Sequence, residues 1–310
     1  MGKLAFLFAG QGSQRVGMGM DLEAGNAAAK AVYAMGEAIR PGVKAMCFSG
    51  DPGELMKTEN TQPCLFLTDL AIAKALRQEG IVPDAAAGFS LGELPAAAFA
   101  GMLSAEDAFR LTLLRGETMA KLSERHPGGM VAALKLDAET VERLCAEFSA
   151  VWPVNYNCPG QIVCAGDTDL LGPFCAAVKE AGGRAVRLPV GSAFHTPYML
   201  EAAGILRGFL AEHPLQTPRI PVYANRTALP YPDDAAARAE TLCMQAASPV
   251  LWERTLRNLE NDGVDTFVEV GAGSTLTGFV RRTLPDARAF TVNDAASLRQ
   301  TVRELTACAV

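Results

Sequence analysis

The chain has 310 residues, of which 49% are hydrophobic and 20% charged, and its formal net charge at pH 7 is −6. This composition is typical of a soluble globular protein and is too apolar for a disordered one. The net negative charge argues against nucleic acid as a partner, and no apolar run reaches the roughly 18–20 residues of a membrane-spanning helix. The eight cysteines are scattered and form no CxxC pair. They indicate reduced thiols, so we expect a cytoplasmic protein.

The first part of the chain predicts alternating strands and helices. Residues 4–8 form a short apolar run that predicts a buried strand, followed by a glycine-rich loop. Apolar spacing at the helical period predicts helices over about 21–40, 63–79 and 105–123. Residues 85–89 predict a short strand that leads directly into a further helix. This alternation is typical of an α/β domain.

The pattern changes in the middle of the chain. Strand, helix, strand, strand, helix and strand follow one another there, which is the order of a ferredoxin-like unit. Apolar runs at 220–225 and 265–271 then predict further strands of the larger domain. We therefore expect a ferredoxin-like (βαββαβ) subdomain at 125–190, inserted into an α/β-hydrolase-like catalytic domain that is formed by 1–124 and 191–310.

A G-x-S-x-G motif spans residues 88–92, where the predicted strand ends and the helix begins. In this motif the serine lies on a sharp turn that needs small neighbours and that exposes its hydroxyl. The helix after the turn directs free N–H groups and its positive end toward developing negative charge. With 29 glycines in the chain the motif also arises by chance, but the strand-to-helix context favours Ser90 as a nucleophile.

A serine nucleophile needs a base, and the chain has three histidines. His126 precedes Pro-Gly-Gly and His213 precedes a proline, so both are expected in solvated surface segments. His195 lies in a loop of small residues where the chain returns from the predicted subdomain. Its position alone fits either a buried structural histidine or a general base. A neutral imidazole is available at cellular pH to take the serine proton.

Nine stretches of the chain match motifs that occur together, and in this order, in one family. They are FAGQGSQ (8–14), NTQP (60–63), GFSLGE (88–93), LRGETM (114–119), NYNCPGQIVCAG (155–166), SAFHTPYM (192–199), VYAN (222–225), QAASPVLW (245–252) and EVGAGSTLTG (269–278). Along nearly its full length the chain thus resembles malonyl-CoA:acyl carrier protein transacylases and the acyltransferase domains of fatty acid and polyketide synthases.

The resemblance implies an activity. A malonyl group would pass from malonyl-CoA to the phosphopantetheine thiol of holo-acyl carrier protein through a malonyl ester on Ser90, in fatty acid biosynthesis. The alternative is a trans-acting acyltransferase or an editing acyl hydrolase of a polyketide pathway. The partners would be the acyl carrier protein and a CoA thioester, with no bound cofactor, no metal and a monomeric chain.

The resemblance also implies roles at the centre of the site. Ser90 would be the nucleophile and His195 its base. A backbone carbonyl near Gln245, rather than a third acidic residue, would hold the imidazole. Backbone N–H groups of Gln11 and Leu91 would form the oxyanion hole.

Four further residues would contact the substrate. From its helical pattern alone Arg115 would lie on a helix surface. The resemblance instead implies that it binds the malonyl carboxylate, which a planar guanidinium holds with two parallel hydrogen bonds. Phe194 would leave no room for an α-methyl group and so favour malonyl over methylmalonyl. Gln62 is a further candidate, and Asn157 is either a turn residue or part of the site.

The chain departs from the family pattern next to the nucleophile. Most members have histidine where this chain has Phe89. The change removes a titratable group beside Ser90 but leaves the expected base in place.

Overall fold

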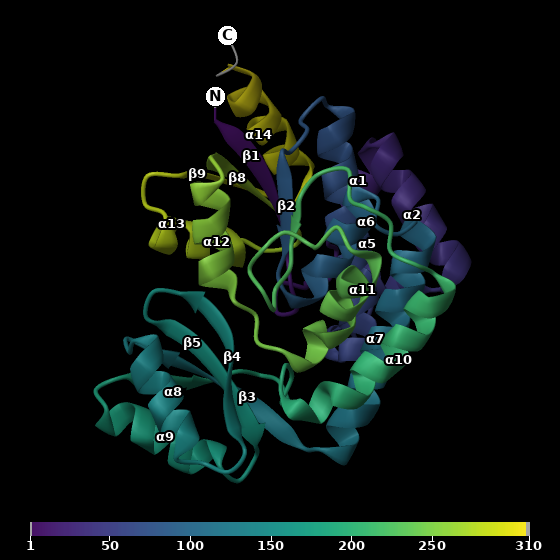
Figure 1. The fold of residues 1–310 in the computed structure, drawn as a ribbon. Coiled ribbons are helices and arrows are strands. Elements are labelled where there is room, and N and C mark those ends of the chain that lie inside the picture. Colours follow the sequence, from purple (N-terminus) through teal and green to yellow (C-terminus); the bar gives the residue numbers. More distant parts are fainter. Residues whose placement is uncertain (1, 308–310) are drawn as a thin grey trace.

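Two β-sheets organise the fold of residues 2–307, which are the residues that the computed structural model describes (Figure 1). The larger sheet has five parallel strands in the order β7-β2-β1-β8-β9. These strands are β1 (Lys3–Phe8), β2 (Ala85–Gly88), β7 (Val222–Tyr223), β8 (Val264–Val270) and β9 (Arg288–Val292). The central strand, β1, is buried from Leu4 onward, as its continuous apolar run predicts.

Alternate side chains of β1 enter two different cores, because successive residues of a strand point to opposite faces of the sheet. Leu4, Phe6 and Phe8 pack against helices on one face. Ala5 and Leu7 pack against helices on the other. The first face is covered by α1 (Met20–Gly25), α2 (Ala27–Ile39), α3 (Val43–Ser49), α4 (Pro52–Met56), α5 (Thr58–Gln78), α6 (Glu93–Ala100), α7 (Ala105–Arg125), α10 (Leu200–Glu212), α11 (Ala235–Cys243) and α14 (Ala295–Ala307). The second face is covered by α12 (Trp252–Asn261) and α13 (Thr275–Thr283).

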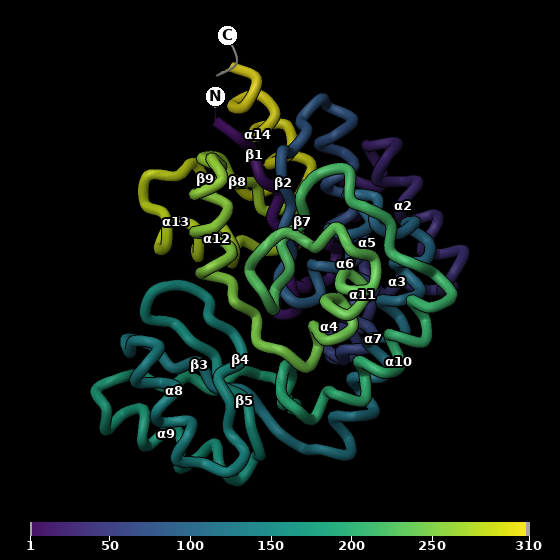
Figure 2. The backbone as a smooth tube through the Cα atoms, in the orientation of Figure 1, coloured from purple at the N-terminus to yellow at the C-terminus, as the bar shows by residue number. Residues whose placement is uncertain are grey.

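The smaller sheet is antiparallel, with the order β4-β5-β3-β6. Its elements are β3 (Gly128–Leu134), α8 (Ala138–Ala146), β4 (Val151–Cys158), β5 (Gln161–Asp167), α9 (Leu171–Glu180) and β6 (Arg184–Arg187). The chain enters this part from α7 and leaves it toward α10 (Figure 2). The expected fold class, an α/β domain with a ferredoxin-like insertion, is confirmed. The exact division at 125 and 190 stays a prediction.

The smaller sheet has two different faces. One packs against its own helices α8 and α9. The other packs against Met119 of α7 and against Phe194 and Met199, which follow the insertion. Backbone hydrogen bonds add a direct link, since Val250 donates to Val154 at 2.8 Å and accepts from Tyr156 at 2.9 Å. The smaller sheet is thereby held against the larger part of the molecule.

Two predicted helices differ from the structure. The segment 21–40 forms two helices, α1 and α2, which are separated at Asn26; its side chain caps α2 by accepting a hydrogen bond from Ala29 N at 3.0 Å. The helix predicted at 63–79 begins earlier, at Thr58, so that Pro63 lies inside it. Proline cannot donate to the carbonyl four residues before it, and inside a helix it normally ends or kinks the helix.

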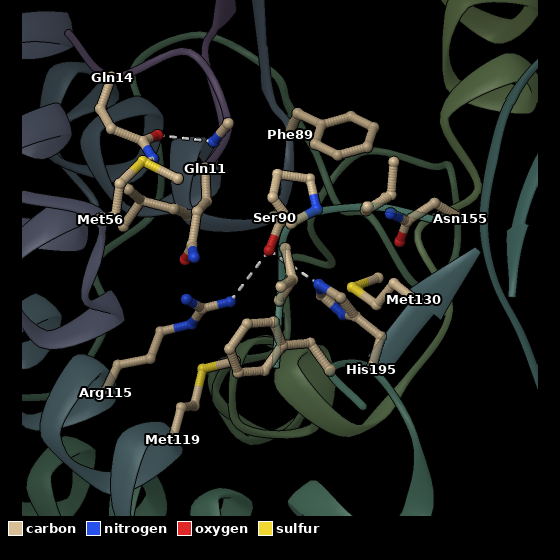
Figure 3. Close-up of a pocket in the computed structure, with 16 residues that line it drawn as sticks. Gln11, Gln14, Met56, Phe89, Ser90, Arg115, Met119, Met130, Asn155 and His195 are labelled. Atoms are coloured by element: carbon tan, nitrogen blue, oxygen red, sulfur yellow. Dashed lines mark hydrogen bonds between the residues drawn. The ribbon is translucent and has the colours of Figure 1, made fainter. Parts of the chain in front are cut away.

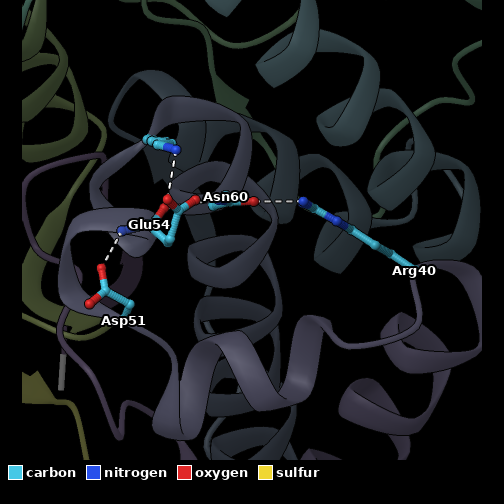
Figure 4. Close-up of polar contacts among 5 residues, drawn as sticks. Arg40, Asp51, Glu54 and Asn60 are labelled. Carbon is cyan, nitrogen blue, oxygen red and sulfur yellow. Dashed lines mark hydrogen bonds and ion pairs between the residues drawn. The ribbon is translucent and has the colours of Figure 1, made fainter.

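Arg40 explains why α5 continues through Pro63. Its Nη1 donates to the carbonyl oxygen of Glu59 at 2.8 Å, which is the acceptor that Pro63 leaves without an intrahelical partner. Its Nη2 donates to Oδ1 of Asn60 at 2.6 Å, and Asn60 in turn donates to the carbonyl of Glu54 (Figure 4). Arg40, which is distant in sequence, therefore donates the hydrogen bond that Pro63 cannot, and local helix propensity could not predict this contact.

Two remaining expectations concern membranes and cysteines. Within residues 2–307 no helix has the length and hydrophobicity needed to cross a membrane. The seven cysteines in this range are free, and six of them are buried. Cys308 lies outside the described residues.

Candidate active site

Ser90 lies at the tip of the turn between β2 and α6, in a short 3-10 helix, η1 (Ser90–Gly92). Its φ angle is 52°, in the left-handed region that strains a residue with a side chain. The glycines of the motif permit this turn. A Cβ on Gly88 would lie 1.9 Å from the carbonyl carbon of Gly92, and one on Gly92 would lie 2.2 Å from the carbonyl oxygen of Phe8. The turn therefore has the packing of a nucleophile elbow.

His195 reaches this turn from 105 residues further along the chain, and its Nε2 lies 2.8 Å from Oγ of Ser90. Its Nδ1 lies 3.2 Å from the carbonyl oxygen of Gln245 and 3.0 Å from that of Ser248. Both of these partners are acceptors, so the ring proton resides on Nδ1 and Nε2 is left to accept the serine proton. The backbone carbonyls of Gln245 and Ser248 thus orient the imidazole.

The environment keeps His195 neutral. Burial, and secondarily the nearby positive charge of Arg115, lower the pKa of His195 to about 4. A neutral imidazole is the form that accepts a proton, so the site is in its basic form throughout the neutral pH range.

Arg115 extends from α7 to the other side of Ser90 and is 2% exposed. Its Nη2 donates to Oγ of Ser90 at 3.2 Å and to Oε1 of Gln245 at 3.0 Å, while Nη1 donates to Oε1 of Gln62 at 2.6 Å (Figure 3 shows the bond to Ser90). The surface position that its helical pattern suggested is wrong, because α7 is covered on this face. Burial lowers the pKa of Arg115 to about 10, which leaves it charged at pH 7.

A cavity of about 320 Å³ opens in front of Ser90, His195 and Arg115. Met130 and Asn155 of the smaller sheet line one side of it, and residues at the ends of β1 and β2 line the other. The volume lies in the range of small-molecule sites. The active-site candidate is therefore formed between the two sheets and needs both.

The two expected oxyanion-hole residues, Gln11 and Leu91, line this cavity. Leu91 is in the first turn of η1, where N–H groups have no partner within the helix. The N–H of Ser90 is already used, because it donates to Oδ1 of Asn225 at 2.7 Å. The placement is compatible with the expected oxyanion hole, which stays a prediction.

Two phenylalanines have different places in the site. Phe194 lines the cavity beside His195. Phe89 packs edge-on against Trp252, with ring centroids 5.3 Å apart, and its ring points away from the hydroxyl of Ser90 (Figure 3). The residue that replaces the usual histidine thus extends an apolar cluster.

Asn157 lies in a second cavity, of about 240 Å³, and does not line the first. The walls of the two cavities share five residues: Gln11, Gly12, Phe89, Asn155 and Leu188. Oδ1 of Asn155 and of Asn157 are both buried without a hydrogen-bond partner. Asn155 was not singled out from the sequence, although its two-residue spacing from Asn157 along one strand indicates that both side chains share a face.

Glu93 is the main residue of the site that sequence reasoning missed. Its side chain is fully buried, and it accepts hydrogen bonds from the hydroxyl of Tyr231, from Asn225 N at 3.2 Å and from Nε2 of Gln245 at 3.1 Å. Burial raises the pKa of Glu93 to about 7. The only sequence signal was its place in the GFSLGE stretch, since its partners lie more than 130 residues downstream.

The other two histidines lie elsewhere, as expected. His126 is exposed and stacks on Tyr198, and Nδ1 of His213 lies 3.2 Å from Oδ1 of Asp107. Neither is among the residues that line the cavity at Ser90.

Comparison with known proteins identifies the family. The model of the acyl transferase domain matches residues 5–308, and the chain belongs to this acyl transferase family. The malonyl CoA-acyl carrier protein transacylase of Bacillus subtilis is 35% identical over 98% of both chains. The crystal structure of the transacylase of the same name from Clostridium perfringens matches with a TM-score of 0.93 at 35% identity, over 99% of this chain and 98% of that one.

A third match shows a relative with its partner. It is a structure of a type II polyketide synthase acyl-carrier protein in complex with its malonyl-transacylase, with a TM-score of 0.93 and 33% identity over 97% of this chain and 99% of that one.

Proposed function

We propose that the chain transfers a malonyl group from malonyl-CoA to the phosphopantetheine thiol of holo-acyl carrier protein through a malonyl ester on Ser90. One observation carries this proposal. The hydroxyl of Ser90 lies 2.8 Å from Nε2 of His195 and 3.2 Å from Nη2 of Arg115. A base and a carboxylate-binding cation thus contact the same nucleophile.

The first half-reaction forms the ester. His195 takes the proton of Ser90 as Oγ attacks the thioester carbonyl carbon of malonyl-CoA. The N–H groups of Gln11 and Leu91 hold the negative oxygen of the tetrahedral intermediate; loss of one such donor typically costs about 2.7–4 kcal/mol of transition-state stabilisation. The carbon–sulfur bond then breaks, and the CoA sulfur leaves with the proton that His195 returns.

The second half-reaction repeats these steps with a different thiol. His195 takes the proton of the phosphopantetheine thiol, and the sulfur attacks the ester carbonyl carbon. The bond to Oγ breaks, and Ser90 regains its proton from His195. These steps are carried by side chains and backbone N–H groups alone.

Arg115 selects the acyl group. In the free site its Nη2 contacts Oγ of Ser90, and in the complex the guanidinium binds the malonyl carboxylate with charge-assisted hydrogen bonds. Without that carboxylate the buried cation has only neutral acceptors, which disfavours acetyl-CoA. Phe194 narrows the same cavity against an α-methyl group.

The names of the relatives support an acyl carrier protein as the partner. Matches named malonyl CoA-acyl carrier protein transacylase cover 98% and 99% of the chain, and a solved relative is bound to an acyl carrier protein. We assign the chain to fatty acid biosynthesis, acting as a cytoplasmic monomer on a separate carrier protein.

Mass spectrometry of the intact protein tests the proposal. After brief exposure to malonyl-CoA, the chain is expected to gain about 86 Da, the mass of an ester-linked malonyl group. Ser90→Ala should show no gain, while Ser49→Ala, a change at an exposed serine, should behave like the wild type. Addition of holo-acyl carrier protein should remove the mass and transfer it to the carrier.

Two outcomes would contradict the proposal. A mass gain that persists in Ser90→Ala would place the ester elsewhere. Rapid loss of the malonyl group to water without carrier protein would favour the editing hydrolase.

A further inference from the structure

The buried carboxylate of Glu93 takes no part in the steps above, although it lies three residues after Ser90 and is fully buried. A buried carboxylate is costly unless it is hydrogen-bonded, and two partners of this one, Asn225 and Gln245, also hydrogen-bond the backbone of Ser90. Its Oε2 accepts from Nε2 of Gln245 at 3.1 Å and from Asn225 N at 3.2 Å. Its Oε1 accepts from the hydroxyl of Tyr231.

Gln245 connects this carboxylate to the cation. The Nε2 end of its amide donates to Glu93 and to the backbone carbonyl of Ser90, and the Oε1 end accepts from Nη2 of Arg115 at 3.0 Å. One amide therefore lies between the buried anion and the buried cation. An amide can present either its oxygen or its nitrogen to a neighbour. A carboxylate and a carbonyl accept but do not donate, so Glu93 and the carbonyl of Ser90 together require the nitrogen end, and the oxygen end then faces Arg115.

We propose that Glu93 is a positioning residue that sets the selectivity for malonyl: it fixes the Gln245 amide with its oxygen toward Arg115, and so holds the guanidinium charged and directed at the cavity. This inference rests on the proposed function. A carboxylate placed directly on Arg115 would compete with the carboxylate of the substrate. The amide spacer avoids that competition, because the acceptors of Arg115 are the neutral Gln245, Gln62 and Ser90 hydroxyl.

Electrostatics agree with this geometry. The negative charge of Glu93 raises the pKa of Arg115, against the larger lowering by burial, and Arg115 in turn lowers the pKa of Glu93. Burial dominates at Glu93 and raises its pKa to about 7, so the carboxylate is mostly ionised at pH 8 and mostly protonated at pH 6. The charged and titratable groups that face it are Arg115 and Tyr231, and neither changes charge between these pH values.

The test is a double-mutant cycle in which kcat/KM is measured for malonyl-CoA and for acetyl-CoA. At pH 8, Glu93→Gln should lower the malonyl-to-acetyl ratio on the order of tenfold, because the new amide can donate as well as accept and leaves only the carbonyl of Ser90 to require the nitrogen end of Gln245. In an Arg115→Ala background the same change should leave the ratio unaltered. Glu93→Asp, which keeps the charge, should restore part of the ratio. Glu240→Gln, at an exposed ion pair, is the matched control and should change nothing.

The pH dependence gives a second measurement, and its main result comes from the wild type alone. The malonyl-to-acetyl ratio of the wild type should fall between pH 8 and pH 6. In Glu93→Gln the ratio should not vary over this range.

Three results would overturn the inference while leaving the proposed function intact. They are an equal loss of both activities in Glu93→Gln, a change of ratio that persists without Arg115, and a wild-type ratio that stays flat or rises toward pH 6. Absence of a malonyl ester on Ser90 in the wild type would instead reject the proposed function itself.

Discussion

The guanidinium of Arg115 donates directly to the hydroxyl of Ser90, at 3.2 Å. In the proposed mechanism this contact places the group that binds the malonyl carboxylate beside the atom that attacks the acyl carbonyl. In a malonyl group the carboxylate carbon is two bonds from the thioester carbonyl carbon. The spacing of the two side chains thus fits the spacing of the two ends of the substrate.

Removal of this guanidinium should lower transfer from malonyl-CoA much more than transfer from acetyl-CoA. Arg115→Ala is expected to lower kcat/KM for malonyl-CoA by at least roughly 10- to 150-fold, since the loss of one charge-assisted hydrogen bond already costs about 1.5–3 kcal/mol. Transfer from acetyl-CoA should be retained or increase. Arg115→Lys keeps the charge but not the two-pronged geometry and should recover little. An equal loss with both substrates would make Arg115 a structural residue only.

The rate of Ser90 acylation should stay high down to a lower pH than it would if His195 had the ordinary pKa of a histidine. Because the pKa of His195 is lowered to about 4, its imidazole remains a base down to about pH 5, where an unperturbed histidine would be largely protonated. Rapid-quench measurements of malonyl ester formation from pH 4 to pH 8 test this in Glu93→Gln, where the neighbouring carboxyl group no longer titrates in this range. An acid limb centred near pH 6.5 would show that His195 is not shielded as the structure indicates.

The same histidine should couple stability to pH. Between its unfolded pKa near 6.5 and its folded pKa near 4, the unfolded chain binds a proton that the folded chain does not. Stability should therefore fall as pH decreases through this window. Urea unfolding at pH 7 and pH 5 should show a smaller loss in His195→Gln than in the wild type. An identical loss in the two proteins would contradict this coupling.

The glycines of the turn should be needed for folding. Gly88→Ala is expected to destabilise the protein by about 1–3 kcal/mol or more, because its Cβ would meet the backbone of Gly92 at 1.9 Å. Gly208→Ala is the matched control. Gly208 lies inside α10, and a Cβ there meets no atom within 4 Å, so alanine should stabilise by about 0.5–1 kcal/mol. Thermal unfolding compares the two, and equal effects would refute the packing argument.

A smaller residue at position 194 should admit a branched acyl group. Phe194→Ala is expected to raise the methylmalonyl-to-malonyl ratio of kcat/KM by about 10- to 200-fold, the usual range for one carbon in an apolar pocket. Because Phe194 also belongs to the same buried apolar cluster as Met130, the folded fraction of the variant has to be checked by circular dichroism. An unchanged ratio in folded protein would show that Phe194 does not set the room for the α-carbon.

Local sequence patterns were sufficient to predict the α/β architecture and the candidate active-site residues. The apolar run at 4–8, the G-x-S-x-G turn and the order of elements in the middle segment each depend on neighbours in sequence, so each could be predicted. The nine ordered motifs then indicated that Ser90, His195 and Arg115 belong to one active site. The predictions failed where the cause was distant, as at the start of α5, where Arg40 satisfies a carbonyl that Pro63 cannot.

Contacts between distant segments were needed for everything that depends on burial. Arg115 is a buried cation because other elements cover its face of α7. The loop after β7 places Asn225 within hydrogen-bonding distance of Ser90. Glu93 is the clearest case, because a glutamate in a sequence carries no sign of whether water surrounds it. Its hydrogen bonds to Asn225, Tyr231 and Gln245 join it to residues more than 130 positions away. Such contacts leave no local pattern in a single chain.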